Sequence, residues 1–333
     1  MPAKINIREN EDEGWIRVAV GDSLLTRFLY DSDHPAIQRP ICYPLMSPTG
    51  SPVTRGYPLE PREGERTDHP HHLGTFFAYG SDPGVEGVDF WNVSEPVENT
   101  GMDQYGWIRH EKHSIEGSAI EAEATWVSGD GRELLAESTR LEFAAIGQRW
   151  CIDRTTTLSA IGNRIRMHDD KEGLFAIRVA RQLEHPDEDV GVPSEIIGEN
   201  LTPTTERPGR IPGTGNYLSA ARETGTDVWG TRARWMRLSG NLSPDEPVSV
   251  TIFDHSDNPG YPTYWHARGY GLFAANPLGQ EIFSDGEQAL RFAIEPNEPV
   301  TFRYRIAVEP NTPTPESLDL RQESFSQDSI EST

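Results

Sequence analysis

The sequence predicts an antiparallel all-β fold, built as one large sandwich or as two stacked sheets. Apolar and polar residues alternate along most periodic segments, as in residues 15–20 (WIRVAV) and 119–127 (AIEAEATWV). Such alternation is typical of strands with one buried face. Turn dipeptides such as Asp130-Gly131 separate these segments, and no convincing helical period precedes residue 312. These observations favour a fold of sheets with few short helices.

The expected strands follow one another along most of the chain. They cover residues 4–8, 15–20, 107–115, 119–127, 133–143, 149–158, 174–182, 234–238, 248–253, 289–294 and 300–308. Two long stretches, residues 39–67 and 184–227, lack clean periodicity and are rich in Pro, Gly and Thr. Loops of this length in a compact domain are usually functional or mobile.

The pattern predicts one β-sandwich domain over residues 1–312. Thr314 and Pro315 resemble the start of a helix, with Thr as the N-cap and Pro at the first helical position. Residues 313–333 are therefore expected to form a short helix followed by a disordered tail, because Ser, Gln and Asp dominate the end of the chain.

The chain is strongly acidic, with 30 Lys and Arg against 53 Asp and Glu and a formal net charge of −23. This charge repels phosphate backbones and anionic lipid surfaces, so neither nucleic acid nor a membrane is an expected partner. No apolar signal region and no membrane span are visible, and the cytoplasm is the expected location. Cys42 and Cys151 predict neither a disulfide nor a thiolate metal site. Nothing in the sequence indicates an oligomeric state.

The segment Asp68-His69-Pro70-His71-His72 is the most informative, because three of the ten histidines fall within four positions. In an extended strand, His69 and His71 share a face and His72 points the other way. Pro70 favours such an extended conformation at His69. Imidazoles transfer protons near neutral pH, so the histidines are candidate acid/base groups that Asp68 would orient. The alternative is that one or more of them are buried core histidines.

A second group of candidates follows an expected strand later in the chain. It begins with His255 and continues with Trp265, His266, Arg268 and Tyr270. Interleaved donors and aromatic rings suit a site that packs on the apolar face of a ligand and binds its hydroxyls. Trp265 and Tyr270 are the expected platforms, unless they belong to an aromatic core. We expect this group to meet the histidine segment in one pocket.

Further charged candidates lie in two other places. Arg55 stands in a long irregular loop, and its forked guanidinium would clamp a carboxylate or a vicinal diol. Lys171 and Glu172, with Arg178, are candidate substrate ligands, although a Lys-Glu pair between strands is usually a solvated turn. The sequence has no phosphate-binding Gly loop, GxSxG elbow or HExxH helix, so nucleotide-dependent and serine-hydrolase chemistry are not expected.

Several segments, taken in order, resemble the family known as PmoA-like or DUF6807. They are residues 39–50 (RPICYPLMSPTG), 54–58 (TRGYP), 68–74 (DHPHHLG), 88–91 (VDFW), 170–178 (DKEGLFAIR), 228–232 (VWGTR) and 253–279. The resemblance implies a galactose-mutarotase-like β-supersandwich and a role in carbohydrate catabolism. It also adds Tyr43 and Trp91 to the candidate substrate ligands. The PmoA name suggests a membrane-bound oxygenase subunit, which does not fit a chain without an expected span.

The leading hypothesis is a carbohydrate-active enzyme, a lyase, hydrolase or epimerase that acts on a sugar or an oxidised (keto) sugar. His71 and His72 are its first acid/base candidates, with Asp68, His69 and His255 behind them. One alternative is a non-catalytic sugar-binding sandwich. The other is a hydrolase or oxygenase that holds a divalent metal with His69, His71 and a carboxylate. No other cofactor is assigned, and a small sugar-like molecule is the expected partner.

Overall fold

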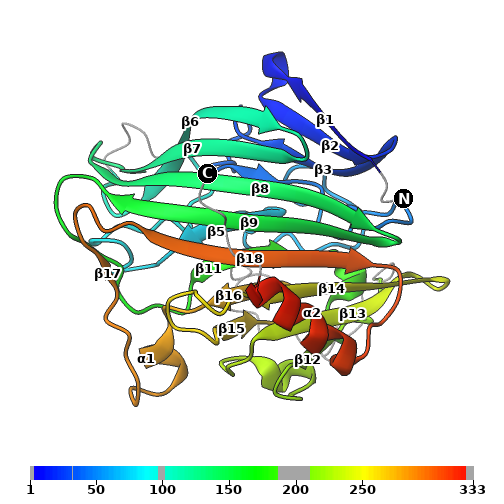
Figure 1. Cartoon of the computed structure of the whole chain (residues 1–333). Helices are drawn as coiled ribbons and strands as arrows, with labels where there is room; N and C mark the ends of the chain where they lie inside the picture. Colours follow the sequence, from blue (N-terminus) through cyan, green and yellow to red (C-terminus); the bar gives the residue numbers. More distant parts are fainter. Residues whose placement is uncertain (1–3, 32, 97–101, 187–210, 328–333) are drawn as a thin grey trace, which may run out of the picture.

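Two large antiparallel sheets form the body of the molecule (Figure 1). The computed structural model describes residues 4–31, 33–96, 102–186 and 211–327. Each large sheet has eight strands, and a two-stranded ribbon joins β10 (Ile165–Arg166) to β17 (Ala293–Ile294). The prediction of an antiparallel all-β fold with few short helices is confirmed. Within the described ranges, no helix has both the length and the apolar character needed to cross a membrane.

The first sheet has the order β1-β2-β3-β4-β5-β11-β16-β15. Its strands are β1 (Ile5–Asn10), β2 (Trp15–Val20), β3 (Ser23–Leu29), β4 (Ile41–Cys42), β5 (Thr75–Tyr79), β11 (Gly173–Arg178), β16 (Leu272–Asn276) and β15 (Tyr264–Ala267). Every residue of β5, β11, β15 and β16 is buried. Strands buried on both faces lack polar alternation, which is why the sequence did not reveal β5, β15 and β16.

The second sheet has the order β12-β13-β14-β18-β9-β8-β7-β6. Its strands are β12 (Asn216–Ser219), β13 (Trp235–Ser243), β14 (Glu246–Asp254), β18 (Val300–Glu309), β9 (Arg149–Ala160), β8 (Glu133–Ile146), β7 (Ala119–Ser128) and β6 (Gly106–Glu116). Buried and exposed residues alternate along most of β8, so the strands expected from alternation are confirmed here. The expected strand 289–294 is wrong except for its last two residues, which form β17.

Aromatic side chains fill the space between the two large sheets. The ring of Phe77 on β5 lies 6.0 Å from that of Phe302 on β18, and Phe175 on β11 stacks on Tyr304 at 5.2 Å. Successive side chains of a strand point to opposite faces, so Phe76 points away from the second sheet. We call this side of the first sheet, turned away from the second sheet, the outer face.

One row of directly paired residues crosses the outer face. It runs from Phe76 on β5 through Ala176 on β11 and Ala274 on β16 to His266 on β15. Arg178 lies two residues beyond Ala176 and therefore points to the same face. The outer face thus brings together His266 and Arg178, which come from the two later groups of candidates, in one sheet with Phe76.

The helix α2 (Pro315–Gln327) covers the second sheet on the side away from the first sheet (Figure 1). The N–H of Ser317 donates to Oγ1 of Thr314 at 3.3 Å, so the expected N-cap is present. Leu318 and Phe325 pack there with Trp235 and other apolar residues of the sheet. The expected short helix therefore continues to Gln327, and residues 328–333 lie outside the described ranges. The other helical segments in the described part of the chain are η1 (Glu11–Glu13), η2 (Arg181–Leu183), η5 (Gly225–Val228) and α1 (Gln280–Phe283).

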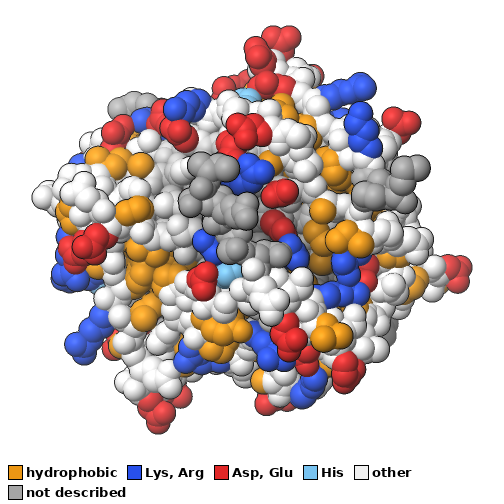
Figure 2. Space-filling view, in the orientation of Figure 1, with side chains coloured by type: hydrophobic (Ala, Val, Ile, Leu, Met, Phe, Trp, Pro, Cys, Tyr) orange, Lys and Arg blue, Asp and Glu red, His pale blue; other side chains and the backbone are white. Residues whose placement is uncertain are grey.

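The surface carries mixed charge. Figure 2 shows acidic and basic side chains scattered over one face, with hydrophobic side chains in small separate patches. The large hydrophobic side chains that are exposed come from distant parts of the described chain, and they are Ile115, Ile146, Ile161, Trp229, Ile282 and Leu320. Single exposed apolar residues of this kind are ordinary.

Candidate functional site

Residues 68–72 form a tight turn, whereas Pro70 favoured an extended conformation at His69. His69 has a φ of 43°, in the left-handed region, and the N–H of His72 donates to the carbonyl of His69 at 3.0 Å. The ring centroids of His71 and His72 lie 4.4 Å apart, and those of His69 and His72 lie 4.9 Å apart. The segment is therefore not extended, and the orientation that an extended strand would give His72, away from the other two rings, does not occur. A non-glycine residue at positive φ is strained and needs firm support from its surroundings.

Two buried arginines supply that support. Arg55 donates to Oδ1 of Asp68 at 2.8 Å and to the carbonyl oxygens of His69 at 2.8 Å and His72 at 3.3 Å. Arg178 donates to the same Oδ1 at 2.8 Å. Burial raises the pKa of Asp68, but His69 and the charges of Arg178 and Arg55 outweigh burial and hold that pKa below its ordinary value. Asp68 is therefore an anion that positions the turn.

The tautomer of His72 follows from its partner. Nη1 of Arg178 lies 3.2 Å from Nδ1 of His72. A guanidinium only donates, so Nδ1 accepts and the proton of the neutral ring is on Nε2. The side chain is buried, and its ring lies 6.2 Å from Phe76 and 5.8 Å from Trp91. His72 therefore holds a fixed N–H donor beside the outer face.

The turn between β15 and β16 brings Tyr270 to the same place. Its ring stacks on His69 with centroids 5.3 Å apart, and Cζ of Arg178 lies 4.7 Å from the ring centroid. Cζ of Arg268 lies 5.6 Å from the same centroid. Burial raises the pKa of Tyr270 to about 12, so the phenol is neutral. Tyr270 therefore contacts the histidine segment, and Arg268 packs against Tyr270.

Arg39 is a residue of this site that the sequence did not single out. It is 3% exposed, and its Nη2 donates to the carbonyl oxygens of Trp91 at 2.8 Å and Val93 at 3.1 Å. Its Cζ lies 5.1 Å from the ring centroid of Phe76, next to the outer face. Arg39 opens the first segment of the family resemblance, but nothing in the local sequence distinguishes it from a surface arginine.

Several buried polar atoms around His72 have no hydrogen-bond partner among the described residues. They include Nε and Nη1 of Arg39, Nε2 of His71, Nε2 of His72 and Nε1 of Trp91. Buried polar atoms in folded proteins are nearly always paired with protein, water or a ligand. Those of Arg39, His72 and Trp91 can only donate, so the cluster suits the oxygen atoms of an acceptor-rich ligand.

Burial also decides the charge of the imidazoles. It lowers the pKa of His71 to about 2, with the charge of Arg39 as the next cause. It lowers the pKa of His72 well below the ordinary value, with His71 and Arg178 adding to the effect. Both rings are therefore neutral at physiological pH. A neutral imidazole in an active site can polarise an oxygen atom through its N–H.

Lys171, Glu172 and His266 form a second cluster near the outer face. Nδ1 of His266 lies 2.7 Å from the carbonyl oxygen of Lys171 and 3.7 Å from Oε2 of Glu172. A carbonyl only accepts, so Nδ1 carries the proton and Nε2 carries the lone pair. His266 is thus the opposite tautomer to His72. Three strand spacings separate its position from that of Phe76, about 14 Å at the usual distance between strands.

Two expected substrate ligands have other roles. Trp265 is fully buried, and its Nε1 donates to the carbonyl of Ala233 at 2.9 Å. It neighbours His266 on the strand and therefore points to the inner face, so it is a core residue and no platform. The hydroxyl of Tyr43 donates to Oε2 of Glu60 at 3.3 Å. Tyr43 thus supports the loop that carries Arg55.

His255 lies far from the other histidines of the prediction. Its ring packs edge-on against Phe325 of α2, with centroids 5.1 Å apart, and its Nδ1 lies 3.2 Å from the backbone N of Asp257. This places the ring on the α2 side of the second sheet. Because both sheets lie between His255 and His72, we leave His255 out of the candidate site.

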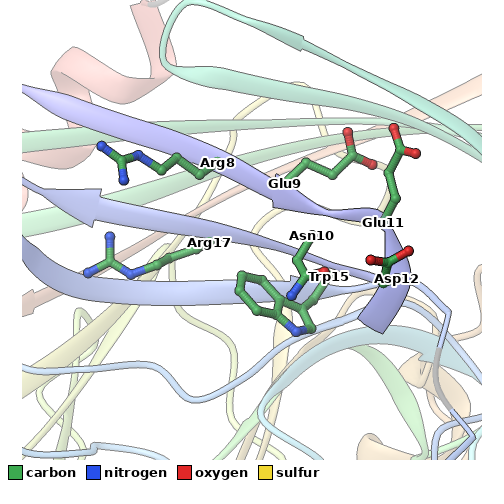
Figure 3. Close-up of a pocket in the computed structure, with 7 residues that line it drawn as sticks. All are labelled: Arg8, Glu9, Asn10, Glu11, Asp12, Trp15 and Arg17. Atoms are coloured by element: carbon green, nitrogen blue, oxygen red, sulfur yellow. The ribbon is translucent and has the colours of Figure 1, made fainter.

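An open pocket of about 480 Å³ lies at the edge of the first sheet (Figure 3). It is lined by Arg8, Glu9, Asn10, Glu11, Asp12, Trp15 and Arg17. Nε1 of Trp15 donates to Glu13 at 2.6 Å, and Nη2 of Arg17 donates to the carbonyl of Asp22 at 2.7 Å. Unlike the histidine turn, this pocket contains no buried side-chain atom that lacks a partner within the described ranges.

The family model described as "Family of unknown function (DUF6807)" matches residues 16–321 of this chain. The chain belongs to the DUF6807 family. The match covers most of the sequence and confirms the resemblance stated above. No curated protein matches the DUF6807 chain in sequence.

Three solved structures illustrate what the DUF6807 chain is similar to. The GH36 α-galactosidase AgaA of Geobacillus stearothermophilus is 10% identical, with a TM-score of 0.38 over 92% of this chain and 41% of that chain. A polysaccharide lyase is 8% identical, with a TM-score of 0.37 over 98% and 35%. A putative aldose 1-epimerase from Escherichia coli K12 is 11% identical, with a TM-score of 0.37 over 92% and 99%. The chain thus spans well under half of the first two proteins.

The donor set of the DUF6807 site does not fit a metal ion. No group of three or more His, Cys, Asp or Glu side chains is arranged to hold a metal in the described part of the chain. The charges of Arg39, Arg55 and Arg178 all act on His71, and they would repel a divalent cation. The metal-dependent alternative that used His69 and His71 therefore finds no support here.

Proposed function

We propose that this DUF6807 protein is a carbohydrate-active enzyme whose ligand binds around His72 on the outer face of the first sheet. The observation that carries the proposal is the set of buried donors without partners on His72, Trp91 and Arg39 among the described residues. Sugars and keto-sugars are rich in hydroxyl and carbonyl oxygens, which are the acceptors that these donors lack. A ligand at this place would complete hydrogen bonds that the described protein groups leave open.

The two fixed tautomers suggest how the site acts. The Nε2–H of His72 can polarise a carbonyl or stabilise negative charge that develops on a ligand oxygen. His266 carries its lone pair on Nε2, while the Lys171 carbonyl holds its Nδ1 proton, as a general base requires. His71, packed against His72, is the second group that can exchange a proton with the ligand.

The distance between these groups bears on the size of the ligand. The row between Phe76 and His266 spans three strand spacings, about 14 Å. A single sugar ring does not reach from one end to the other, whereas a glycoside with two rings does. A lyase or hydrolase that acts on a glycoside or keto-glycoside therefore fits both clusters better than an epimerase, which needs only one ring.

One observation favours the second candidate, a non-catalytic sugar-binding protein. Burial lowers the pKa of His71 to about 2, and an imidazole with so low a pKa is a weak proton acceptor. Neutral N–H donors suffice for binding without any reaction.

Separate measurements of binding and turnover distinguish the two candidates. Wild type and His71→Gln would be titrated with a panel of glycosides and keto-glycosides, and the products would be followed by NMR. The enzyme proposal expects turnover in wild type and, in the variant, a loss of about 10²–10⁴-fold in rate with much smaller loss of binding. Tight binding without turnover in wild type across the panel would instead identify a binding protein.

A further inference from the structure

The interior beside the histidine turn holds more positive than negative charge. Arg39, Arg55 and Arg178 are 3%, 2% and 0% exposed. Arg55 and Arg178 share one carboxylate, because both donate to Oδ1 of Asp68. Two buried guanidinium groups on one carboxylate leave a net positive charge, although the whole chain has a formal net charge of −23.

Arg39 has no ion pair of its own within the described ranges. Its two protein hydrogen bonds go to the carbonyl oxygens of Trp91 and Val93, which carry no formal charge. The charge of Asp89 acts on Arg39, but the oxygens of Asp89 accept from the N–H groups of Trp91 and Asn92 and from the Asn92 amide. Burying a charge without a close partner is costly, so the fold maintains Arg39 at an energetic expense.

The free atoms of Arg39 belong to the same cluster as those of the proposed sugar site. Nε and Nη1 of Arg39 lack partners among the described residues, as do Nε1 of Trp91 and Nε2 of His72. The ring of Phe76 links the three groups, because Arg39, Trp91 and His72 all pack against it. Cationic and neutral donors that converge without an acceptor are what an anionic oxygen group requires.

We infer that the ligand of this site is an anionic sugar, with a carboxylate or phosphate held by Arg39 and Trp91. This inference rests on the proposed function and narrows it: Arg39 and Trp91 neutralise the acid group, while His72 meets a neighbouring oxygen of the same ligand. The shared chemistry is an oxyanion on a sugar ring. A carboxylate belongs to uronic or aldonic acids, and a phosphate belongs to sugar phosphates.

Calorimetric titration of the folded wild-type protein at low salt tests the inference with matched ligands. Methyl glucuronide and methyl glucoside differ in the acid group, and glucuronamide keeps the shape of the acid without its charge. We expect methyl glucuronide or glucose 6-phosphate to bind at least about tenfold more tightly than both neutral sugars, a ratio that charge-assisted hydrogen bonds produce. Whichever of the two anions binds more tightly identifies the acid group.

Single-residue variants test whether Arg39 and Trp91 cause the preference for the anionic sugar. Arg39→Gln removes the cation and keeps an amide donor, so it should reduce the preference for the anion over the neutral sugar to less than about threefold. Trp91→Phe removes one donor and keeps the ring, so it should weaken anion binding even if Arg39→Gln fails to fold. Arg17→Gln changes an arginine in the pocket on β1 and β2 and serves as the control, with wild-type preference expected.

The outcomes separate this inference from the proposed function. Equal binding of neutral and anionic sugars, with Trp91→Phe and Arg39→Gln unchanged in preference, overturns the inference and leaves the sugar site standing. Binding of acetate or phosphate alone, without any sugar, overturns the proposed function and retains only an anion site. Binding of anionic sugars that survives in both variants places the anion elsewhere and overturns the inference.

Discussion

Nη1 of Arg178 lies 3.2 Å from Nδ1 of His72, across 106 positions of sequence. This contact fixes the tautomer of His72 and leaves its Nε2–H without a partner among the described residues. Substitution of His72 by Asn or by Gln tests the acceptor role of Nδ1 and the donor role of Nε2 separately. The oxygen of Asn can stand in for Nδ1, and the terminal nitrogen of Gln can stand in for Nε2, so His72→Asn and His72→Gln form a matched pair.

His72→Asn should keep the bond from Arg178 and lose the donor, with a melting temperature near that of wild type and a rate lower by about 10²–10³-fold. His72→Gln should keep the donor but leave Arg178 without its acceptor, at a cost of about 1–3 kcal/mol in the free energy of unfolding. Thermal melts and turnover of both variants check the ranking. A more active Asn variant would contradict the role assigned to Nε2.

Asp68→Asn should destabilise the protein, because Arg55 and Arg178 would lose the anion that they share. We expect a loss of about 1–3 kcal/mol in the free energy of unfolding near pH 7, reduced from that of a fully buried pair because Asp68 is partly exposed. The pKa of Asp68 lies below its ordinary value in the folded state, so its contribution is present above about pH 4 and is lost as the pH falls further. Denaturant melts should therefore show a shallower acid dependence in the variant. An unchanged stability at pH 7 would show that Asp68 does not hold the turn.

The lowered pKa of His110 leads to a different pH dependence of the free energy of unfolding. Its Nε2 lies 3.0 Å from Nδ1 of His113, and burial, with the charge of His113, lowers the pKa of His110 to about 4. Unfolded histidine titrates near pH 6.5, so between about pH 6.5 and 4 the unfolded chain binds a proton that the folded protein does not. Stability should be complete above this window and should fall as the pH drops through it. Urea melts of His110→Gln should show a weaker fall than wild type and a similar stability at pH 8; parallel profiles would argue against this assignment.

Trp265 and Tyr270 should respond differently to removal of the ring. Trp265→Ala opens a cavity in the core and should cost about 3–5 kcal/mol, with ligand affinity preserved in the protein that still folds. Tyr270→Ala removes the ring that stacks on His69 and should reduce affinity with a smaller loss of stability. Melting temperatures and binding titrations of the two variants give the comparison. A larger effect of Trp265 on binding than on stability would restore it as a platform.

The sequence revealed the strands that have one solvent-exposed face and one buried face. The long strands β8 and β9 alternate clearly because one face of each contacts the core. In contrast, β5 (TFFAY) is buried throughout and carries no period, so its place beneath the site could not be predicted. Strand order also depends on contacts between residues more than a hundred positions apart, for which a single sequence has no signal.

The site was partly predictable. The density of His69, His71 and His72 identified the segment as a candidate, but its tight turn depends on Arg55, which donates to the backbone from another loop. The adjacency of Trp265 and His266 already implied that only one of them could face the ligand, since neighbours on a strand point to opposite faces. Arg39 had no local signal, because its importance comes from burial next to Phe76, which only the fold creates.

The most direct test of the account is a crystal structure of the protein with the sugar that binds most tightly in the titrations. We predict ligand oxygens within hydrogen-bonding distance, about 3.2 Å or less, of Nε2 of His72 and Nε1 of Trp91. A ligand seated in the pocket of β1 and β2 beside Trp15, with the nitrogens of His72 and Trp91 bound only to water, would contradict it.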